Sequence, residues 1–84
     1  MVIKYLGQSE DVTSEVYLEV REVETLPIME ITFDIDTQSI TDYSVVSENL
    51  GVSLEYCRKF LEEREAEVIE EVLVELDKRG FEFC

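Results

Sequence analysis

The fold is decided by residues 28–46, which read IMEITFDIDTQSITDYSVV. In the first half of this stretch every second side chain is apolar, and polar residues stand between them. A period of two is typical of a strand that is buried on one face. The sequence therefore predicts a strand over residues 28–36, and its inward-facing side chains are Met29, Ile31, Phe33 and Ile35.

A hairpin follows, with Thr37, Gln38 and Ser39 as its loop and residues 40–46 as the returning strand. We expect a three-residue loop, because a two-residue loop would place Asp42 opposite the buried Phe33. The predicted pairs are Thr41 with Ile35, Tyr43 with Phe33, and Val45 with Ile31.

Two more strands precede this hairpin. Residues 15–23 alternate in the same way and predict a half-buried strand, with Val16, Leu18 and Val20 on its inner face. Residues 2–6 predict a short strand, and residues 24–27 a turn that Pro27 closes.

After Ser47 the apolar period changes from two to about 3.6, which predicts a long helix. Ser53 suits the N-cap and Gly80 suits the position just beyond the C-terminus, so the helix is expected to run to Arg79. Glu65 falls near the middle of the apolar stripe, and we expect a bend at residues 62–65 that leaves its carboxylate in water. The stripe consists of Leu54, Cys57, Leu61, Val68, Ile69, Val72, Leu73 and Leu76.

Together these elements predict a single α+β domain over residues 1–84. Its antiparallel meander of three to four strands is covered on one face by one long C-terminal α-helix. At about 1.5 Å per residue the helix is ~39 Å long, whereas strands of this length reach ~25–30 Å. The helix must therefore overhang the sheet, bend, or meet a second subunit.

A ladder of carboxylates runs along the polar side of this helix. Glu63, Glu67, Glu71 and Glu75 are four residues apart, and like charges at this spacing repel one another. The chain has 21 acidic and 7 basic residues, a net charge of −14, so the ladder is treated as uncompensated. We interpret it as a surface that imitates nucleic-acid phosphates, against the alternative of an ordinary solvated helix face. The candidate partner-binding residues on the helix are Glu63, Glu67, Glu70, Glu71, Glu75 and Asp77.

A second acidic surface is expected on the outer face of the sheet. Its candidate residues are Glu30, Asp34, Asp36 and Asp42. Residues 34–45 also contain part of a calcium-loop pattern, but Ser39 stands where the loop needs Gly and Val45 where it needs Glu. We therefore expect a hairpin there and no bound metal.

The composition also excludes several function classes. The chain has no His, no Gly-rich phosphate loop and only two Cys, so we expect no enzyme, no cofactor and no zinc site. The net charge argues against direct binding to nucleic acid or to an anionic membrane. No run approaches the ~20 apolar residues of a membrane span, and residues 1–6 are too short for a signal peptide, so a cytoplasmic protein is expected. Cys57 is expected to be a small buried hydrophobe and Cys84 a free thiol.

In size and charge the chain is similar to phage-encoded inhibitors that mimic DNA, such as anti-restriction proteins, anti-CRISPR proteins and glycosylase inhibitors. This resemblance implies a non-enzymatic inhibitor that occupies the basic groove of a nucleic-acid-binding protein. One alternative is a structural protein that forms a homodimer through Leu61, Val68, Val72 and Leu76. Another is a small housekeeping domain that binds a small molecule.

Overall fold

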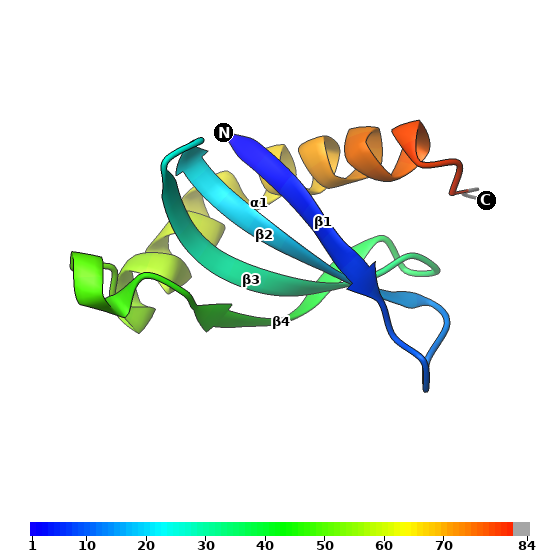
Figure 1. The fold of residues 1–84 in the computed structure, drawn as a ribbon, viewed down its shortest axis with the longest axis horizontal. Helices are drawn as coiled ribbons and strands as arrows, with labels where there is room; N and C mark the ends of the chain where they lie inside the picture. Colours follow the sequence, from blue (N-terminus) through cyan, green and yellow to red (C-terminus); the bar gives the residue numbers. More distant parts are fainter. Residues whose placement is uncertain (82–84) are drawn as a thin grey trace.

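A computed structural model describes residues 1–81 of the chain (Figure 1). Four antiparallel strands form one sheet in the order β1-β2-β3-β4, and a long helix lies across one face of it. This arrangement confirms the predicted α+β meander, with four strands. The elements are β1 (Val2–Gln8), β2 (Glu15–Val23), β3 (Leu26–Asp34), β4 (Ser39–Val45), the short 3-10 helix η1 (Glu48–Leu50) and α1 (Leu54–Lys78).

The core lies between the central strands and α1. Alternate residues of β2 and β3 point towards the helix, and they are at most 1% exposed. The helix contributes Val68, Val72 and Leu76, which have no exposed surface. Burial of such side chains is the main stabilising contribution in a domain of this size. The fully buried strand residues are Val16, Leu18, Val20, Ile28, Met29, Ile31 and Phe33.

The predicted register of the β3–β4 hairpin was wrong. Tyr43 lies opposite Ile31 rather than Phe33, and a bulge at Thr41 separates the Asp42–Thr32 pair from the Ile40–Phe33 pair. The cause is Asp34, whose Oδ1 accepts hydrogen bonds from the backbone N–H groups of Asp36 and Thr37 at 2.8 and 3.2 Å. This turn ends β3 early, so that residues 35–38 form the loop. Asp42 is nevertheless exposed, as expected.

The turn between β2 and β3 also differs from the prediction. Only Glu24 and Thr25 separate β2 from β3, and Pro27 lies within β3 opposite Arg21. Proline is tolerated there because it stands near the start of the strand, beside an irregularity in the pairing. Ile28 is the extra residue at this irregularity, which explains why Ile28 and its neighbour Met29 are both buried.

The predicted N-cap Ser53 and the predicted role of Gly80 are confirmed, and the helix ends at Lys78, one residue before the predicted Arg79. Ser53 has an extended backbone, and its side chain accepts a hydrogen bond from the backbone N–H of Tyr56 at 3.1 Å. At the other end the N–H of Gly80 donates to the carbonyl of Asp77, and the N–H of Phe81 donates to that of Leu76. Gly80 has φ +85°, the left-handed conformation that this Schellman motif requires. Cys84 lies outside the described residues.

The predicted bend of the helix is confirmed at Arg64, whose backbone leaves helical geometry at φ −129° and ψ 19°. The carboxylate of Glu65 is exposed, as expected. The bend divides α1 into a first segment, residues 54–63, and a second segment, residues 65–78. Within the first segment Phe60 is buried, whereas Leu54 is 60% exposed, which corrects the predicted apolar stripe.

Candidate acidic binding surface

The acidic ladder lies on the side of α1 that faces away from the sheet. Val68, Val72 and Leu76 hold the second segment against the core, and this orientation turns the intervening carboxylates outward. Because the helix is anchored along its length, its outward side chains keep a fixed spacing. Of the six predicted helix residues, Glu75 is half-buried, and the exposed ones are Glu63, Glu67, Glu70, Glu71 and Asp77.

Two members of the ladder are not free, which corrects the expectation that it is uncompensated. Nε and Nη2 of Arg64 each donate a hydrogen bond of 2.9 Å to the carboxylate of Glu67. Nε of Arg79 donates to Oε1 of Glu75 at 3.2 Å. A count of charges along the helix does not show which carboxylate each arginine side chain contacts, so these pairs were not predicted.

The contact with Arg64 also changes the chemistry of Glu67. The hydrogen bond from Arg64 is the largest cause that lowers the pKa of Glu67, and the positive charge of the guanidinium acts in the same direction. The carboxylate therefore stays ionised to lower pH than an ordinary glutamate. Since its charge is already paired, it offers little to a partner.

Four of the predicted helix carboxylates, two of them in the ladder, remain open to a partner. Within residues 1–81, Glu63, Glu70, Glu71 and Asp77 form no salt bridge. From Glu63 to Asp77 there are 14 residue steps, or roughly 21 Å along the helix at 1.5 Å per residue. Their mean axial spacing of roughly 7 Å is about twice the spacing of phosphates along one DNA strand.

The first segment of α1 is more nearly balanced in charge. Arg58 donates hydrogen bonds to Glu55 and to Glu62, the latter at 2.6 Å. The hydrogen bond from Arg58 is the largest cause that lowers the pKa of Glu55. Unpaired negative charge is therefore concentrated on the second segment of the helix.

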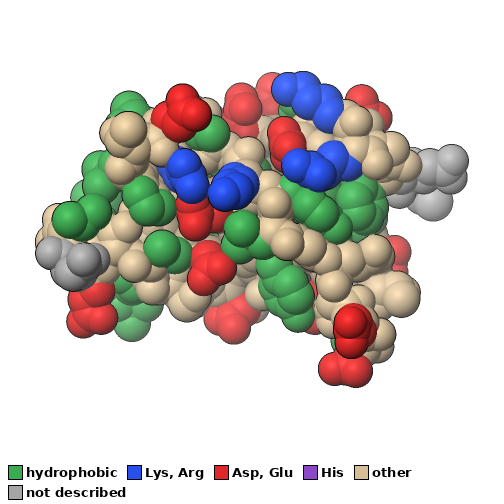
Figure 2. Space-filling model, viewed as in Figure 1, with side chains coloured by type: hydrophobic (Ala, Val, Ile, Leu, Met, Phe, Trp, Pro, Cys, Tyr) green, Lys and Arg blue, Asp and Glu red, His purple; other side chains and the backbone are tan. Residues whose placement is uncertain are grey.

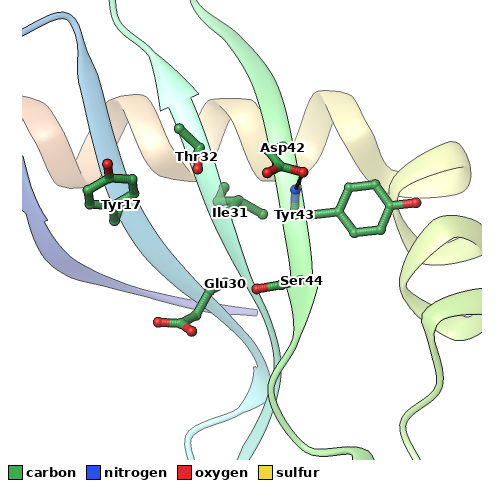
Figure 3. Close-up of a pocket in the computed structure, with 7 residues that line it drawn as sticks. All are labelled: Tyr17, Glu30, Ile31, Thr32, Asp42, Tyr43 and Ser44. Atoms are coloured by element: carbon green, nitrogen blue, oxygen red, sulfur yellow. Dashed lines mark hydrogen bonds between the residues drawn. The ribbon is translucent and has the colours of Figure 1, made fainter. Parts of the chain in front are cut away.

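Glu30 and Asp42 lie on the outer face of the sheet. They border a hollow of about 170 Å³ that also involves Tyr17, Thr32 and Ser44 (Figure 3). One oxygen of Asp42 accepts a hydrogen bond from the backbone N–H of Tyr43 at 2.8 Å. Both carboxylates remain exposed to solvent.

The other two predicted sheet residues belong to the β3–β4 loop and its border. Asp34 is half-buried, and its Oδ1 already accepts the two backbone hydrogen bonds that shape the turn. The side chain of Asp36 is exposed. Asp34 was predicted to bind a partner, whereas in the structure its carboxylate shapes the turn.

The helix and sheet carboxylates lie on opposite sides of the molecule, because α1 covers only the inner face of the sheet. The outer face carries apolar, acidic and basic side chains interspersed, as Figure 2 shows. Its negative charge is therefore less concentrated than that of the second helix segment. A flat partner surface can contact only one of the two faces at a time.

Two further hollows were not foreseen from the sequence. Lys4, Arg21 and Arg79 converge on a hollow of about 290 Å³ beside β1, together with Glu24 and Glu75. These cations are far apart in the sequence, so no local pattern indicated that they meet. A groove lies between β4 and α1 around the bend and includes Arg58, Glu62 and Glu65, and no local pattern in the sequence predicted it.

Among residues 1–81 there is no group of three or more side chains placed to hold a metal ion. Within the same residues, α1 is too polar along its length to cross a membrane.

Comparisons of the chain with protein-family models, with curated proteins and with solved structures each found no match.

Proposed function

We propose that the chain is a non-enzymatic binding protein that presents the second segment of α1 to a basic protein surface. Its carboxylates would take the place of nucleic-acid phosphates in the groove of a nucleic-acid-binding protein and so inhibit that protein. Anti-restriction and anti-CRISPR proteins are inhibitors of this kind. On this proposal the carboxylates of α1 bind Lys and Arg side chains of the partner.

The observation that supports this proposal is the set of unpaired carboxylates Glu70, Glu71 and Asp77 on the second segment, with Glu63 directly before the bend. They are held on an anchored helix, so little backbone conformational entropy is lost when they are brought to a partner. A net charge of −14 adds long-range attraction towards a basic surface. Association would therefore be fast and would weaken with salt.

The homodimer alternative requires apolar side chains that are buried within the chain itself. Val68, Val72 and Leu76 have no exposed area, and Leu61 is 7% exposed, because all four pack against the sheet of their own chain. Pairing through these side chains would require the helix to leave its own core.

A capture experiment tests the proposal. Tagged wild-type protein is incubated with nuclease-treated lysate at about 50 and 500 mM salt, and captured proteins are identified by mass spectrometry. We expect a nucleic-acid-binding protein at low salt, less of it at high salt, and its displacement by added DNA. Salt sensitivity is expected because exposed charges more than about one Debye length apart are screened.

Matched double variants locate the binding surface. Glu70→Lys with Glu71→Lys reverses two unpaired charges of the second segment, and we expect it to abolish capture. Glu10→Lys with Asp11→Lys makes the same change in net charge on two adjacent exposed residues of the β1–β2 loop, and capture should persist. Equal loss in both variants would mean that net charge alone drives binding, and full capture by the helix variant would overturn the proposal.

A further inference from the structure

A groove runs between the edge of the sheet and the first segment of α1. It encloses about 280 Å³. Figure 3 shows the ring of Tyr43 reaching from β4 towards the helix at this place. The residues that border the groove are Ile40, Thr41, Asp42 and Tyr43 on the strand, and Arg58, Leu61, Glu62 and Glu65 on the helix.

The strand beside the groove has an open edge. Within the described residues β4 pairs only with β3, so its outer edge carries no neighbouring strand. Backbone N–H and C=O groups on such an edge are available to pair with another extended chain. Recognition of a peptide that adds a strand to a sheet is a common mode, in which the backbone supplies affinity and alternate side chains supply specificity.

We propose that this groove binds an extended, basic segment of a partner protein, which pairs with the edge of β4. The inference goes beyond the function proposed above, because it concerns a different surface and stands whether or not the acidic ladder binds anything.

The floor of the groove suits the apolar side chains of such a segment. Ile40 and Tyr43 are half-buried, and Leu61 is 7% exposed, so each turns apolar surface towards the hollow. In an extended segment alternate side chains point to the same side and are about 6.7 Å apart. Every second residue of the bound segment would therefore face the floor.

The rim of the groove suits basic side chains. It carries the carboxylates of Asp42, Glu62 and Glu65 against one cation, Arg58, whose charge is already shared between Glu55 and Glu62. Glu65 is exposed and forms no salt bridge within residues 1–81. The bend at Arg64 is what carries this carboxylate out of the apolar stripe to the rim.

A second copy of the chain fits the groove poorly. Two β4 edges brought together would set the rim carboxylates Asp42 and Glu65 of one copy near those of the other, and like charges across paired strands are destabilising. A basic segment does not meet this repulsion, because its charge opposes that of the rim.

The test uses three blocked heptapeptides of alternating Val and Lys. One has an ordinary backbone, one is N-methylated on every Val, and one on every Lys. Binding is followed by NMR chemical-shift changes of the ¹⁵N-labelled protein at about 150 mM salt. Only one set of alternate N–H groups can face β4, so we expect one methylated peptide to bind at least about tenfold more weakly, equivalent to about 1.4 kcal/mol. The other should bind like the unmodified peptide.

The position of the shifts and one pair of variants complete the test. We expect changes at residues 40–43 and 58–65, and weaker binding to the Glu65→Gln variant than to the wild type. Glu10→Gln is the matched control, since Glu10 lies in the β1–β2 loop at the opposite edge of the sheet. Equal binding of all three peptides, or shifts confined to residues 66–78, would show attraction by charge alone and overturn the inference. A dimer paired through β4 in sedimentation equilibrium would overturn it as well.

Discussion

Arg64 donates two hydrogen bonds of 2.9 Å to Glu67, although the backbone of Arg64 itself is not helical. The same guanidinium lies 4.8 Å from the centroid of the Phe60 ring and reaches Glu22 of β2 at 3.4 Å. One side chain thus ties both segments of α1 and the sheet together at the bend. These contacts of Arg64 therefore stabilise the bend.

The first prediction concerns the pH dependence of this contact. The pKa of Glu67 is lowered in the folded protein, first by the hydrogen bond from Arg64. A group with a lowered folded-state pKa stabilises the fold above its unfolded-state pKa, which is about 4.3 for glutamate, and this contribution is lost as pH falls through the folded-state value. We expect an NMR titration of the Glu67 carboxyl to show a higher pKa in the Arg64→Gln variant than in the wild type.

The stability of the two proteins provides the control for that titration. The advantage of the wild type over Arg64→Gln in urea unfolding should be larger at pH 7 than at pH 3, because protonated Glu67 no longer pairs with Arg64. A constant difference across this range would assign the role of Arg64 to its stacking on Phe60 alone.

The second prediction separates paired from unpaired members of the ladder. Glu71→Gln removes a charge that has no partner among residues 1–81 and that adds to the repulsion along α1, so the free energy of unfolding should rise, by at most roughly 0.5 kcal/mol at low salt. Glu67→Gln removes a paired charge and should bring no such gain. Urea denaturation at about 20 mM and 500 mM salt checks this, since the gain of Glu71→Gln should shrink as salt screens the charges. Equal gains in both variants would contradict the pairing.

The third prediction concerns the start of α1. Ser53→Ala removes the acceptor for the backbone N–H of Tyr56 and should lower the free energy of unfolding by about 1 kcal/mol. Ser53→Asp keeps an acceptor at the N-cap and should preserve stability. Thermal or urea unfolding of both variants is sufficient. Destabilisation by Asp as large as that by Ala would mean that the hydroxyl does not act as a cap.

The order and type of the main elements could be predicted because each has a local cause. Alternating apolar residues specify the sheet, and Ser53 and Gly80 specify the ends of the helix. The register of β4 could not be predicted, because it depends on the hydrogen bonds that the side chain of Asp34 accepts from the N–H groups of Asp36 and Thr37. Because β3 ends two residues before the predicted end and β4 begins one residue before its predicted start, every pair of the hairpin changes.

The candidate site was predictable to a smaller degree. The polar side of the helix follows from periodicity, so the outward position of Glu70 and Glu71 could be predicted without the structure. Which carboxylates remain free depends on the reach of Arg64 and Arg79, and hence on the bend and on the end of the helix. The groove beside β4 depends on a contact between elements that no local pattern describes.

The last prediction tests the anchor that holds the ladder in place. Leu76 has no exposed surface, whereas Val74, two residues away on the same helix, is 47% exposed. Leu76→Ala leaves a cavity and should cost about 2–5 kcal/mol, while Val74→Ala should change stability by less than about 0.5 kcal/mol. Urea unfolding with hydrogen exchange of residues 65–78 measures both effects. An 84-residue domain has only a few kcal/mol to lose, so a largely unfolded Leu76→Ala protein fits the expectation. If both variants were equally stable, the second segment would not be anchored through Leu76, and the fixed spacing of its carboxylates would lose its physical basis.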